Sequence, residues 1–337
     1  MVKSIGAPLP HPEAVHTVAL SPDGKYAATG ADNNVRLWDA KSGKLLATLE
    51  GHGGHVQSLA FSPDTKTLLS GAADKAARLW DVAGRKLIAT LDHKGMVYAV
   101  AFNPNGKSVV TGSHDASGRL WDAANGKPIG IPLQHKEKLY AVAFSPDGML
   151  VATSGNDGFA RLWNAETGET TGLAVQHQGS IRSLSFSPDS KKLLTGSLDK
   201  TARVWDVLSG KPVGPPLKHQ DQVRASAYDP KGKYLLTGSL DKTAQLWRAD
   251  TFQPAGPPLA HPGGVRCVAF SPDGKLVLTG GLDGTARLWH TDTSKPFAAP
   301  LEHQAMVRAA AFSQAGGLIL TGSFDKTARL WKLVGMP

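Results

Sequence analysis

The chain has 337 residues and a formal net charge of +9, and its basic residues are spread along the sequence without a basic block. Its single cysteine, Cys267, excludes a disulfide within the chain and a cysteine-based metal site. No stretch approaches the roughly 18 apolar residues of a membrane span, the start MVKSIGAPLP lacks the apolar core of a secretory signal, and no nucleic-acid motif is present. We therefore expect a cytoplasmic protein that neither spans a membrane nor binds nucleic acid, although its positive charge favours anionic partners at long range.

Eight copies of one pattern run through the whole sequence. Each copy contains Thr or Ser, then an Asp, and then a Trp six residues after that Asp. The tryptophans, which are all the Trp residues of the chain, are Trp38, Trp80, Trp121, Trp163, Trp205, Trp247, Trp289 and Trp331. A period near 40 residues with one Trp per copy indicates a repeat architecture. Because the copies use up the chain, the sequence predicts one domain over residues 1–337, without a linker or a second domain.

Within one copy, alternating apolar and polar residues predict four short strands separated by turns. In the fifth copy these strands are Ile181–Phe186, Lys191–Ser197, Thr201–Trp205 and the Pro-containing segment Val213–Leu217, and the first turn is SPDS at 187–190. Pro at the second position of a turn presets a type I turn, and Pro in the fourth strand suits a sheet edge. The first strands of successive copies open at Val15, Val56, Val97, Leu139, Ile181, Val223, Val265 and Val307, and no window shows a helical period.

Four-stranded units that repeat around an axis form a β-propeller, so the sequence predicts an all-β fold, a single eight-bladed propeller with four antiparallel strands per blade. The chain stops just after the third strand of the eighth copy, whereas its start, IGAPLPH at 5–11, matches VGPPLKH at 213–219. We therefore expect the N-terminal strand to complete the last blade and close the ring, since an open ring would expose unpaired strand edges. The first copy is one residue short between Thr29 and Asp32, which predicts a tighter turn there.

These repeats resemble the WD-repeat β-propeller family. The Trp-Asp pair of that family stands at Trp38-Asp39, Trp80-Asp81, Trp121-Asp122 and Trp205-Asp206, and its Gly-His pair stands at Gly51-His52. The resemblance covers essentially the whole chain and implies the propeller fold, but this fold hosts many functions. Most members have seven blades, so eight blades imply a wider central channel.

His, Asp and Thr in one repeat could suggest a hydrolase triad. However, a catalytic site needs one such set in a cleft, whereas this set recurs in every copy, and the resemblance implies structural hydrogen-bonded tetrads instead. In the fifth and sixth copies the tetrads are His177, Thr195, Asp199 and Trp205, and His219, Thr237, Asp241 and Trp247. Pairs such as His52 and His55 lack a carboxylate or Cys to complete a metal site. We expect no catalytic residue, no cofactor and no metal.

Two positions that break the repeat are the candidates for a partner site, and the resemblance places both at the upper mouth of the channel. The residue after the first-strand opening is, in successive copies, His16, Gln57, Tyr98, Tyr140, Arg182, Arg224, Arg266 and Arg308. The residue before the turn Asp is Ala31, Ala73, His114, Asn156, Leu198, Leu240, Leu282 and Phe324. Copies 5 to 8 therefore carry four arginines and four large apolar residues, whereas copies 1 to 4 carry small, polar or aromatic ones.

Arginine and large apolar side chains anchor protein interfaces, and arginine pairs with carboxylate or phosphate in a forked geometry. The sequence thus favours a monomeric, non-catalytic scaffold whose upper face on blades 5–8, with Tyr98 and Tyr140 beside it, docks an acidic or phosphorylated peptide or protein segment. Alternatives stay open. Blades 5–8 share a segment like Leu-Asp-Lys-Thr-Ala-Arg and could be recent duplicates without a selected site. The channel could also serve a ligand-binding or enzymatic propeller, and the chain could be a module of a larger protein or an engineered propeller.

Overall fold

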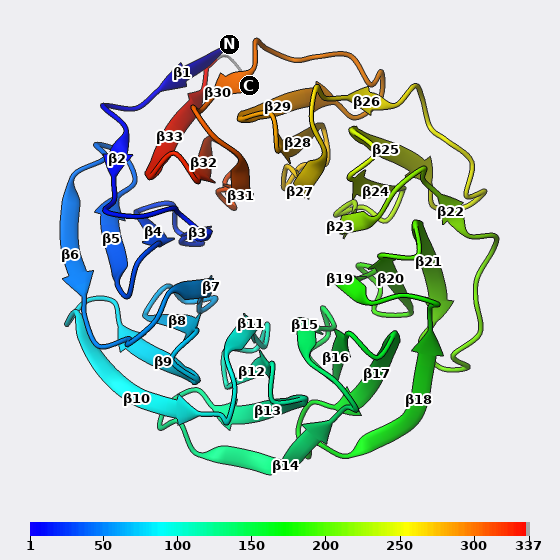
Figure 1. The fold of residues 1–337 in the computed structure, drawn as a ribbon, viewed down its shortest axis with the longest axis horizontal. Coiled ribbons are helices and arrows are strands. Elements are labelled where there is room, and N and C mark those ends of the chain that lie inside the picture. Colours follow the sequence, from blue (N-terminus) through cyan, green and yellow to red (C-terminus); the bar gives the residue numbers. More distant parts are fainter. Residues whose placement is uncertain (335–337) are drawn as a thin grey trace.

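The computed structural model describes residues 1–334, and every regular element in this part of the chain is a β-strand. Eight antiparallel sheets stand around a central axis like the blades of a propeller (Figure 1). Within each of blades 1 to 7 the strands follow one another outward from the axis in chain order, and we call the strands of a blade a to d from the axis outward. The prediction of an all-β, eight-bladed propeller is confirmed.

Blades 1 to 4 each have four regular strands. Blade 1 contains β3 (Thr17–Leu20), β4 (Tyr26–Gly30), β5 (Val35–Asp39) and β6 (Leu45–Leu49). Blade 2 contains β7 (Val56–Phe61), β8 (Thr67–Ala72), β9 (Ala76–Asp81) and β10 (Lys86–Asp92). Blade 3 contains β11 (Val97–Phe102), β12 (Ser108–Ser113), β13 (Ser117–Asp122) and β14 (Pro128–Gln134). Blade 4 contains β15 (Leu139–Phe144), β16 (Leu150–Gly155), β17 (Phe159–Asn164) and β18 (Thr170–Gln176).

Blades 5 to 7 have a much shorter strand d. Blade 5 contains β19 (Ile181–Phe186), β20 (Lys192–Ser197), β21 (Thr201–Asp206) and β22 (Leu217–Lys218). Blade 6 contains β23 (Val223–Tyr228), β24 (Tyr234–Ser239), β25 (Thr243–Arg248) and β26 (Leu259–Ala260), and blade 7 contains β27 (Val265–Phe270), β28 (Leu276–Gly281), β29 (Thr285–His290) and β30 (Leu301–Glu302). The predicted strand Val213–Leu217 is wrong in extent, since its only strand residue is Leu217. Pro215 and Pro216 have no N–H to donate to β21, so the pairing is interrupted between Val213, whose N–H donates to Val204 O at 2.8 Å, and β22.

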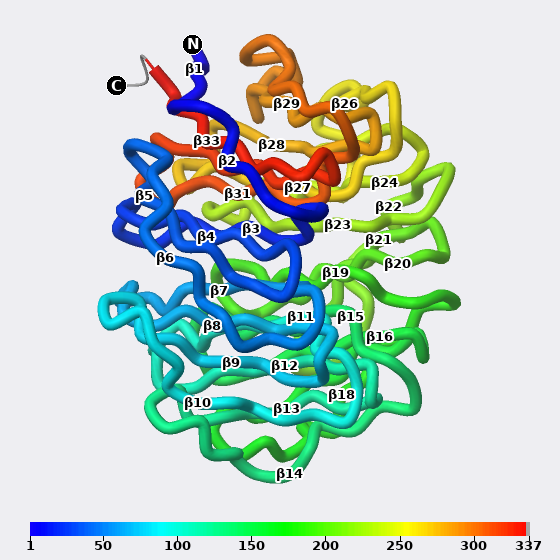
Figure 2. Tube along the Cα trace, turned by 60° about the vertical axis from the view of Figure 1, so that its left-hand side comes forward, coloured from blue at the N-terminus to red at the C-terminus, as the bar shows by residue number. Residues whose placement is uncertain are grey.

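Blade 8 combines the two ends of the chain. The C-terminal part supplies β31 (Val307–Phe312), β32 (Leu318–Ser323) and β33 (Thr327–Leu333), and the N-terminal part supplies β1 (Val2–Ser4) and β2 (Leu9–Pro10), which both pair with β33. Leu9 lies opposite Ala328, just as Leu217 lies opposite Ala202 in blade 5. Figure 2 shows the N-terminal segment beside β33. The predicted closure of the ring is confirmed, and β1 is an additional contact that the repeat pattern does not show.

The hydrophobic core lies between neighbouring blades. One cluster joins Ala152 and Leu162 of blade 4 to Leu193 and Trp205 of blade 5. Strand b is buried along almost its whole length because a sheet packs on each of its faces. A glycine in strand b permits this approach, since a Cβ on Gly238 would lie 2.7 Å from a methyl carbon of the next blade. Each blade is therefore stabilised by its neighbours, as in other repeat architectures.

Candidate partner-binding site

A β-bulge near the start of strand a aims one side chain from each of seven blades toward the channel. In β19, Ile181 pairs with Ser197 but the next pair is Ser183 with Gly196, so Arg182 has no partner across the ladder. The same shift occurs at Gln57, Tyr98, Tyr140, Arg224, Arg266 and Arg308. A bulge changes the direction of its extra side chain. The pairing in blade 1 has no such shift, in keeping with its one missing residue.

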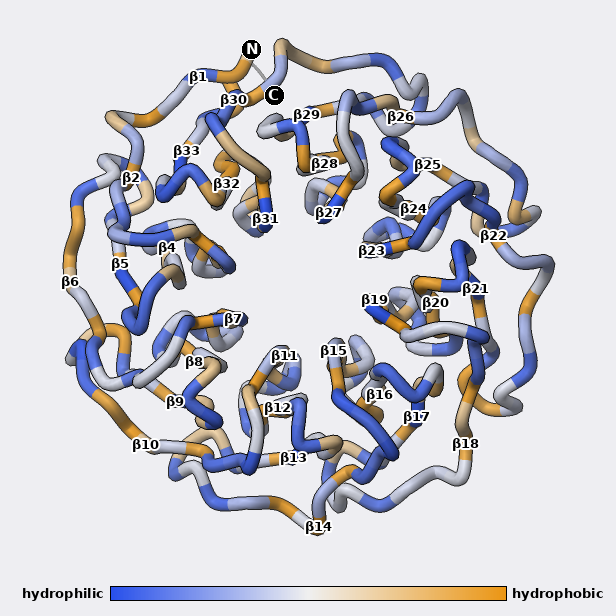
Figure 3. Tube along the Cα trace, in the orientation of Figure 1, coloured by the Kyte–Doolittle hydropathy of each residue, from blue (hydrophilic) through white to orange (hydrophobic). Residues whose placement is uncertain are grey.

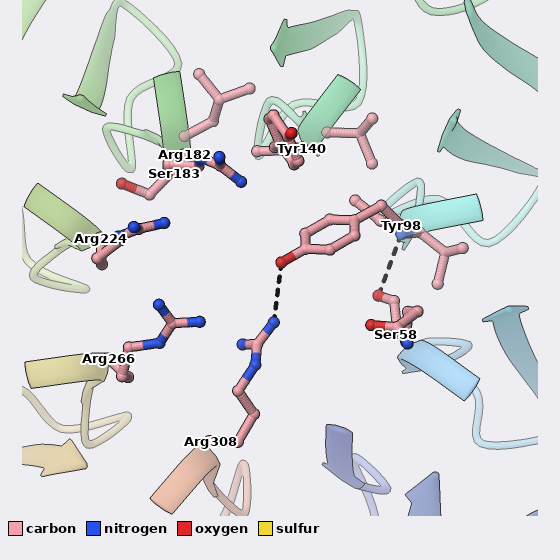
Figure 4. Close-up of a pocket in the computed structure, with 14 residues that line it drawn as sticks. Ser58, Tyr98, Tyr140, Arg182, Ser183, Arg224, Arg266 and Arg308 are labelled. Atoms are coloured by element: carbon pink, nitrogen blue, oxygen red, sulfur yellow. Dashed lines mark hydrogen bonds between the residues drawn. The ribbon is translucent and has the colours of Figure 1, made fainter. Parts of the chain in front are cut away.

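The seven bulged side chains line one cavity of about 330 Å³ in the channel, together with the hydroxyls of Ser58 and Ser183. Figure 4 shows the four arginines of blades 5–8 and Tyr98 of blade 3 pointing toward the centre of this cavity. Figure 3 shows hydrophilic residues at the inner strands β19, β23, β27 and β31, which carry these arginines. We call Arg182, Arg224, Arg266 and Arg308 the arginine cluster. The structure thus brings six of the ten predicted partner-binding residues together, namely the cluster, Tyr98 and Tyr140.

The arginine cluster has few partners of its own. Arg308 Nη2 donates a hydrogen bond of 2.9 Å to the hydroxyl oxygen of Tyr98. Arg224 Nη2 donates one of 2.6 Å to Gln222 Oε1. Within residues 1–334, the arginines that form ion pairs are those of strand c and not those of the cluster. None of the four guanidiniums therefore forms an ion pair with a carboxylate among the described residues, although the charge of Asp221 acts on Arg224.

Burial and mutual repulsion act on the charges of the cluster. Burial, and then the charges of Arg308 and Arg224, lower the pKa of Arg266 to about 10. Burial, and then the charge of Arg182, also lower the pKa of Arg224. Both guanidiniums stay protonated at neutral pH. The Nε atoms of Arg182, Arg224 and Arg266 are buried and have no hydrogen-bond partner among the described residues.

Tyr98 and Tyr140 line the cavity on blades 3 and 4, and His114 packs against both rings. Tyr98 and His114 stack with ring centroids 5.3 Å apart, and Tyr140 meets both rings edge-on. Arg182 lies over Tyr140 with its Cζ 3.4 Å from the ring centroid, which is a cation–π contact. Burial, and then the charges of Lys138 and Arg182, lower the pKa of His114, which favours the neutral form of this ring.

The four large apolar residues lie at the same end of the blades as the arginine cluster. The backbone N–H of Leu198 donates a hydrogen bond of 2.9 Å to the carbonyl just before β19, so the end of strand b meets the start of strand a. We call this end the upper face. Leu282 and Phe324 are 45% and 36% exposed, whereas Leu198 and Leu240 are half-buried. The apolar residues thus form a rim around the mouth of the channel, and the arginines lie inside it.

The hydrogen-bonded groups that the repeats imply are present in blades 5 and 6. In blade 5, His177 Nε2 lies 2.7 Å from Thr195 Oγ1, Trp205 Nε1 donates to the same oxygen at 2.9 Å, and His177 Nδ1 lies 2.8 Å from Asp199. In blade 6 the corresponding distances for His219, Thr237, Trp247 and Asp241 are 2.7, 2.8 and 2.8 Å. Burial raises the pKa of Asp199, but hydrogen bonds from His177 and Thr201 outweigh it and hold that pKa well below its usual range.

Blade 1 departs from this pattern. His11 Nε2 lies 2.7 Å from Thr29 Oγ1, but His11 Nδ1 contacts the carbonyl oxygen of Leu9 at 3.0 Å and not Asp32. Asp32 accepts two hydrogen bonds from Arg36, at 2.7 and 3.0 Å. A complete tetrad in every copy is therefore a wrong expectation for blade 1, because the missing residue before Asp32 moves the carboxylate away from His11.

Sequence reasoning missed several residues around the cavity. Gln222 holds Arg224, and Ser58 and Ser183 line the wall. No motif marks them, because their roles depend on the direction of the bulged side chains. Within residues 1–334, no group of three His, Cys, Asp or Glu side chains is placed to hold a metal ion. In the same part of the chain, no helix of the length and apolarity of a membrane span is found.

Comparison with known proteins places these repeats in a family. The family model described as WD domain, G-beta repeat matches residues 4–39, 43–81, 85–122, 126–164, 170–206, 210–248, 257–290 and 296–332. Each matched segment begins near strand d of one blade and ends in strand c of the next. The sequence repeat is thus offset from the structural blade by one strand, and closure of the ring by the N-terminus follows from this offset.

A search of curated proteins found no match to the chain. Among solved structures, the chain is similar to the crystal structure of the computationally designed Ika8 protein, with 26% sequence identity, coverage of 98% of this chain and 100% of that chain, and a TM-score of 0.87. Propellers of WD repeats are generally non-enzymatic scaffolds for protein interactions. Because the family model matches segments along most of the length of the chain, the chain belongs to the WD-repeat β-propeller family.

Proposed function

We propose that this propeller is a non-catalytic interaction scaffold whose upper face on blades 5–8 docks an acidic or phosphorylated peptide segment that carries a bulky apolar residue. One observation carries the proposal: two kinds of anchor lie at the same end of the same four blades. The arginine cluster lies inside the channel, and Leu282 and Phe324 are exposed on the rim. The acidic or phosphorylated group enters the channel while the apolar residue packs against the rim.

The chemistry of the two anchors suits such a segment. A guanidinium presents a planar fork that matches carboxylate and phosphate oxygens, and these charge-assisted hydrogen bonds are stronger than neutral ones. Apolar side chains clustered beside arginine are typical of the few residues that contribute most of the binding energy in an interface. The positive charge of the cluster also accelerates the approach of an anionic partner.

Duplication of blades 5–8 accounts for four identical arginines without any binding site. A binding measurement therefore has to distinguish duplication from a selected site. Two features favour a site. The four arginines converge on one cavity with the tyrosines of blades 3 and 4 (Figure 4). The residue before the turn Asp is large in all four blades without being identical, since Leu282 is followed by Phe324 in the next blade.

The test measures peptide binding by a charge-reversed variant. The probe is selected from a peptide array in which one position is Ser, phosphoserine or Glu and the neighbouring position is Leu or Ser. Fluorescence anisotropy then gives the affinity of the peptide that binds most tightly. Arg224→Glu/Arg266→Glu is compared with Lys231→Glu/Lys275→Glu, a matched control whose exposed lysines lie in the turns at the opposite end of blades 6 and 7. We expect a loss of about 100-fold for the arginine variant and less than about threefold for the control. Equal affinity of the arginine variant and the wild type refutes the proposal.

A further inference from the structure

The cavity inside the channel has a chemistry of its own, separate from the rim. Each guanidinium carries five N–H donors and no acceptor. The hydrogen bonds of the cluster within residues 1–334 are those from Arg308 to Tyr98 and from Arg224 to Gln222, and the Nε donors of Arg182, Arg224 and Arg266 are buried without a partner among these residues. Buried polar groups in proteins are nearly always hydrogen-bonded, and unpaired ones call for an explanation. A bound anion supplies the missing acceptors.

The number of charges indicates how highly charged that anion is. Four guanidiniums from four consecutive blades share one cavity, and no ion pair within the described residues neutralises any of them. A single carboxylate would leave most of this positive charge unbalanced. Like charges close together in a partly buried site repel one another more strongly than in water. The cluster therefore matches an anion that carries several negative charges within a small volume.

The arrangement of donors indicates the shape of the anion. The guanidiniums extend from β19, β23, β27 and β31, and Tyr98 extends from β11, so the donors approach one centre from several sides (Figure 4). Tyr98 accepts the hydrogen bond of Arg308, which leaves its own O–H free to donate into the cavity. A volume of about 330 Å³ holds a small molecule but is at the lower end for organic ligands. Converging donors suit tetrahedral phosphoryl groups better than a planar carboxylate.

We propose that the arginine cluster and Tyr98 form a binding site for a free, compact anion that carries at least two linked phosphoryl groups. The guanidinium forks of blades 5–8 hold the outer phosphoryl oxygens, and the Tyr98 hydroxyl donates to the anion from the opposite wall. The site shares its arginines with the docking face proposed above, but it needs no residue of the apolar rim. The two proposals can therefore fail separately.

The experiment measures binding of inorganic tripolyphosphate to the whole chain by isothermal titration calorimetry at physiological ionic strength, with orthophosphate and citrate as comparison anions. Arg224→Gln/Arg266→Gln is compared with Lys231→Gln/Lys275→Gln, which removes the same two charges at the other end of the same blades. We expect tripolyphosphate to bind about 10-fold or more tightly than either comparison anion, and the arginine variant to lose about 10-fold or more while the lysine variant keeps its affinity.

Thermal unfolding separates a binding site from a structural role of the arginines. Because the cluster repels itself, the arginine variant without ligand should melt at the wild-type temperature or above it, whereas tripolyphosphate should raise the melting temperature of the wild type and of the lysine variant but not that of the arginine variant. Equal losses in the arginine and lysine variants, or citrate binding as tightly as tripolyphosphate, overturn the proposal. A doubly phosphorylated peptide that binds about 10-fold more tightly than tripolyphosphate also overturns it, because the anion then belongs to a protein chain.

A second variant distinguishes this site from the proposed docking face. Leu282→Ser/Phe324→Ser removes the two exposed rim residues and leaves the cluster intact. This variant should keep the tripolyphosphate affinity of the wild type and lose the peptide. Loss of tripolyphosphate binding in the rim variant would show that the cavity is not an independent site.

Discussion

Removal of residues 1–11 should destroy most of the stability of the propeller, because this segment closes the ring. Leu9 is 2% exposed and packs against the core between blades 8 and 1. The segment also makes backbone hydrogen bonds to the last strand, from Ile5 N to Leu330 O at 2.8 Å and from His11 N to Lys326 O at 2.9 Å. Burial of a leucine contributes about 1.5–3 kcal/mol, and each hydrogen bond adds about 0.5–1.5 kcal/mol.

Together with the pairing of β1, the loss amounts to roughly 4–8 kcal/mol, which is comparable to the total stability of about 5–15 kcal/mol that is usual for a folded domain. The deletion also exposes the outer edge of β33, so we expect aggregation as well. The assay is urea unfolding followed by tryptophan fluorescence, with size-exclusion chromatography to detect aggregates. A deleted chain with an unchanged unfolding midpoint would refute the reasoning about closure.

A matched pair of point variants separates loss of packing from loss of closure. Leu9→Ala and Leu217→Ala remove the same side chain from the same register position, but only the first lies in the segment that joins the two ends of the chain. Each should cost about 2–5 kcal/mol, since both leucines are almost fully buried. If Leu9→Ala alone unfolds the protein, closure depends on this one contact and not on the whole N-terminal segment.

Three further predictions concern stability. Asp199→Ala should lower the free energy of unfolding by about 1–3 kcal/mol, and the double variant with His177→Ala should cost less than the two single losses added together, as urea titration can show. Burial lowers the pKa of His52 from 6.5 to about 4 in the folded protein. The unfolded chain therefore binds the proton more readily than the folded chain does. The stability that this histidine contributes above pH 6.5 is thus lost as the pH falls toward 4. Unfolding midpoints across this range should show the fall, and His52→Gln should reduce its slope. Gly238→Ala places a Cβ 2.7 Å from Val268 Cγ1 and should cost about 1–3 kcal/mol, so an unchanged melting temperature would show that the blade interface can adjust.

Part of the candidate site could be predicted from the sequence. The positions of Arg182 and its three equivalents stand out because they break a regular repeat, and the structure places all four in one cavity. The division between arginines in the channel and Leu282 and Phe324 on the rim could not be predicted, because it depends on the bulge in strand a. The partners of individual arginines, such as Gln222, carry no sequence signal at all.

The number of blades, the order of strands and the closure of the ring could all be predicted from the sequence, since they follow from the period of the tryptophans and from a fourth-strand motif displaced to the N-terminus. Such features are local, and each copy repeats them. Two features became visible only in the folded chain: the outer strands of blades 5–7 shrink to two residues, and blade 1 forms no complete tetrad. The same holds for the cavity that is shared by arginines 42 residues apart along the chain, because their proximity arises when eight sheets pack around a common axis and a bulge turns each side chain inward.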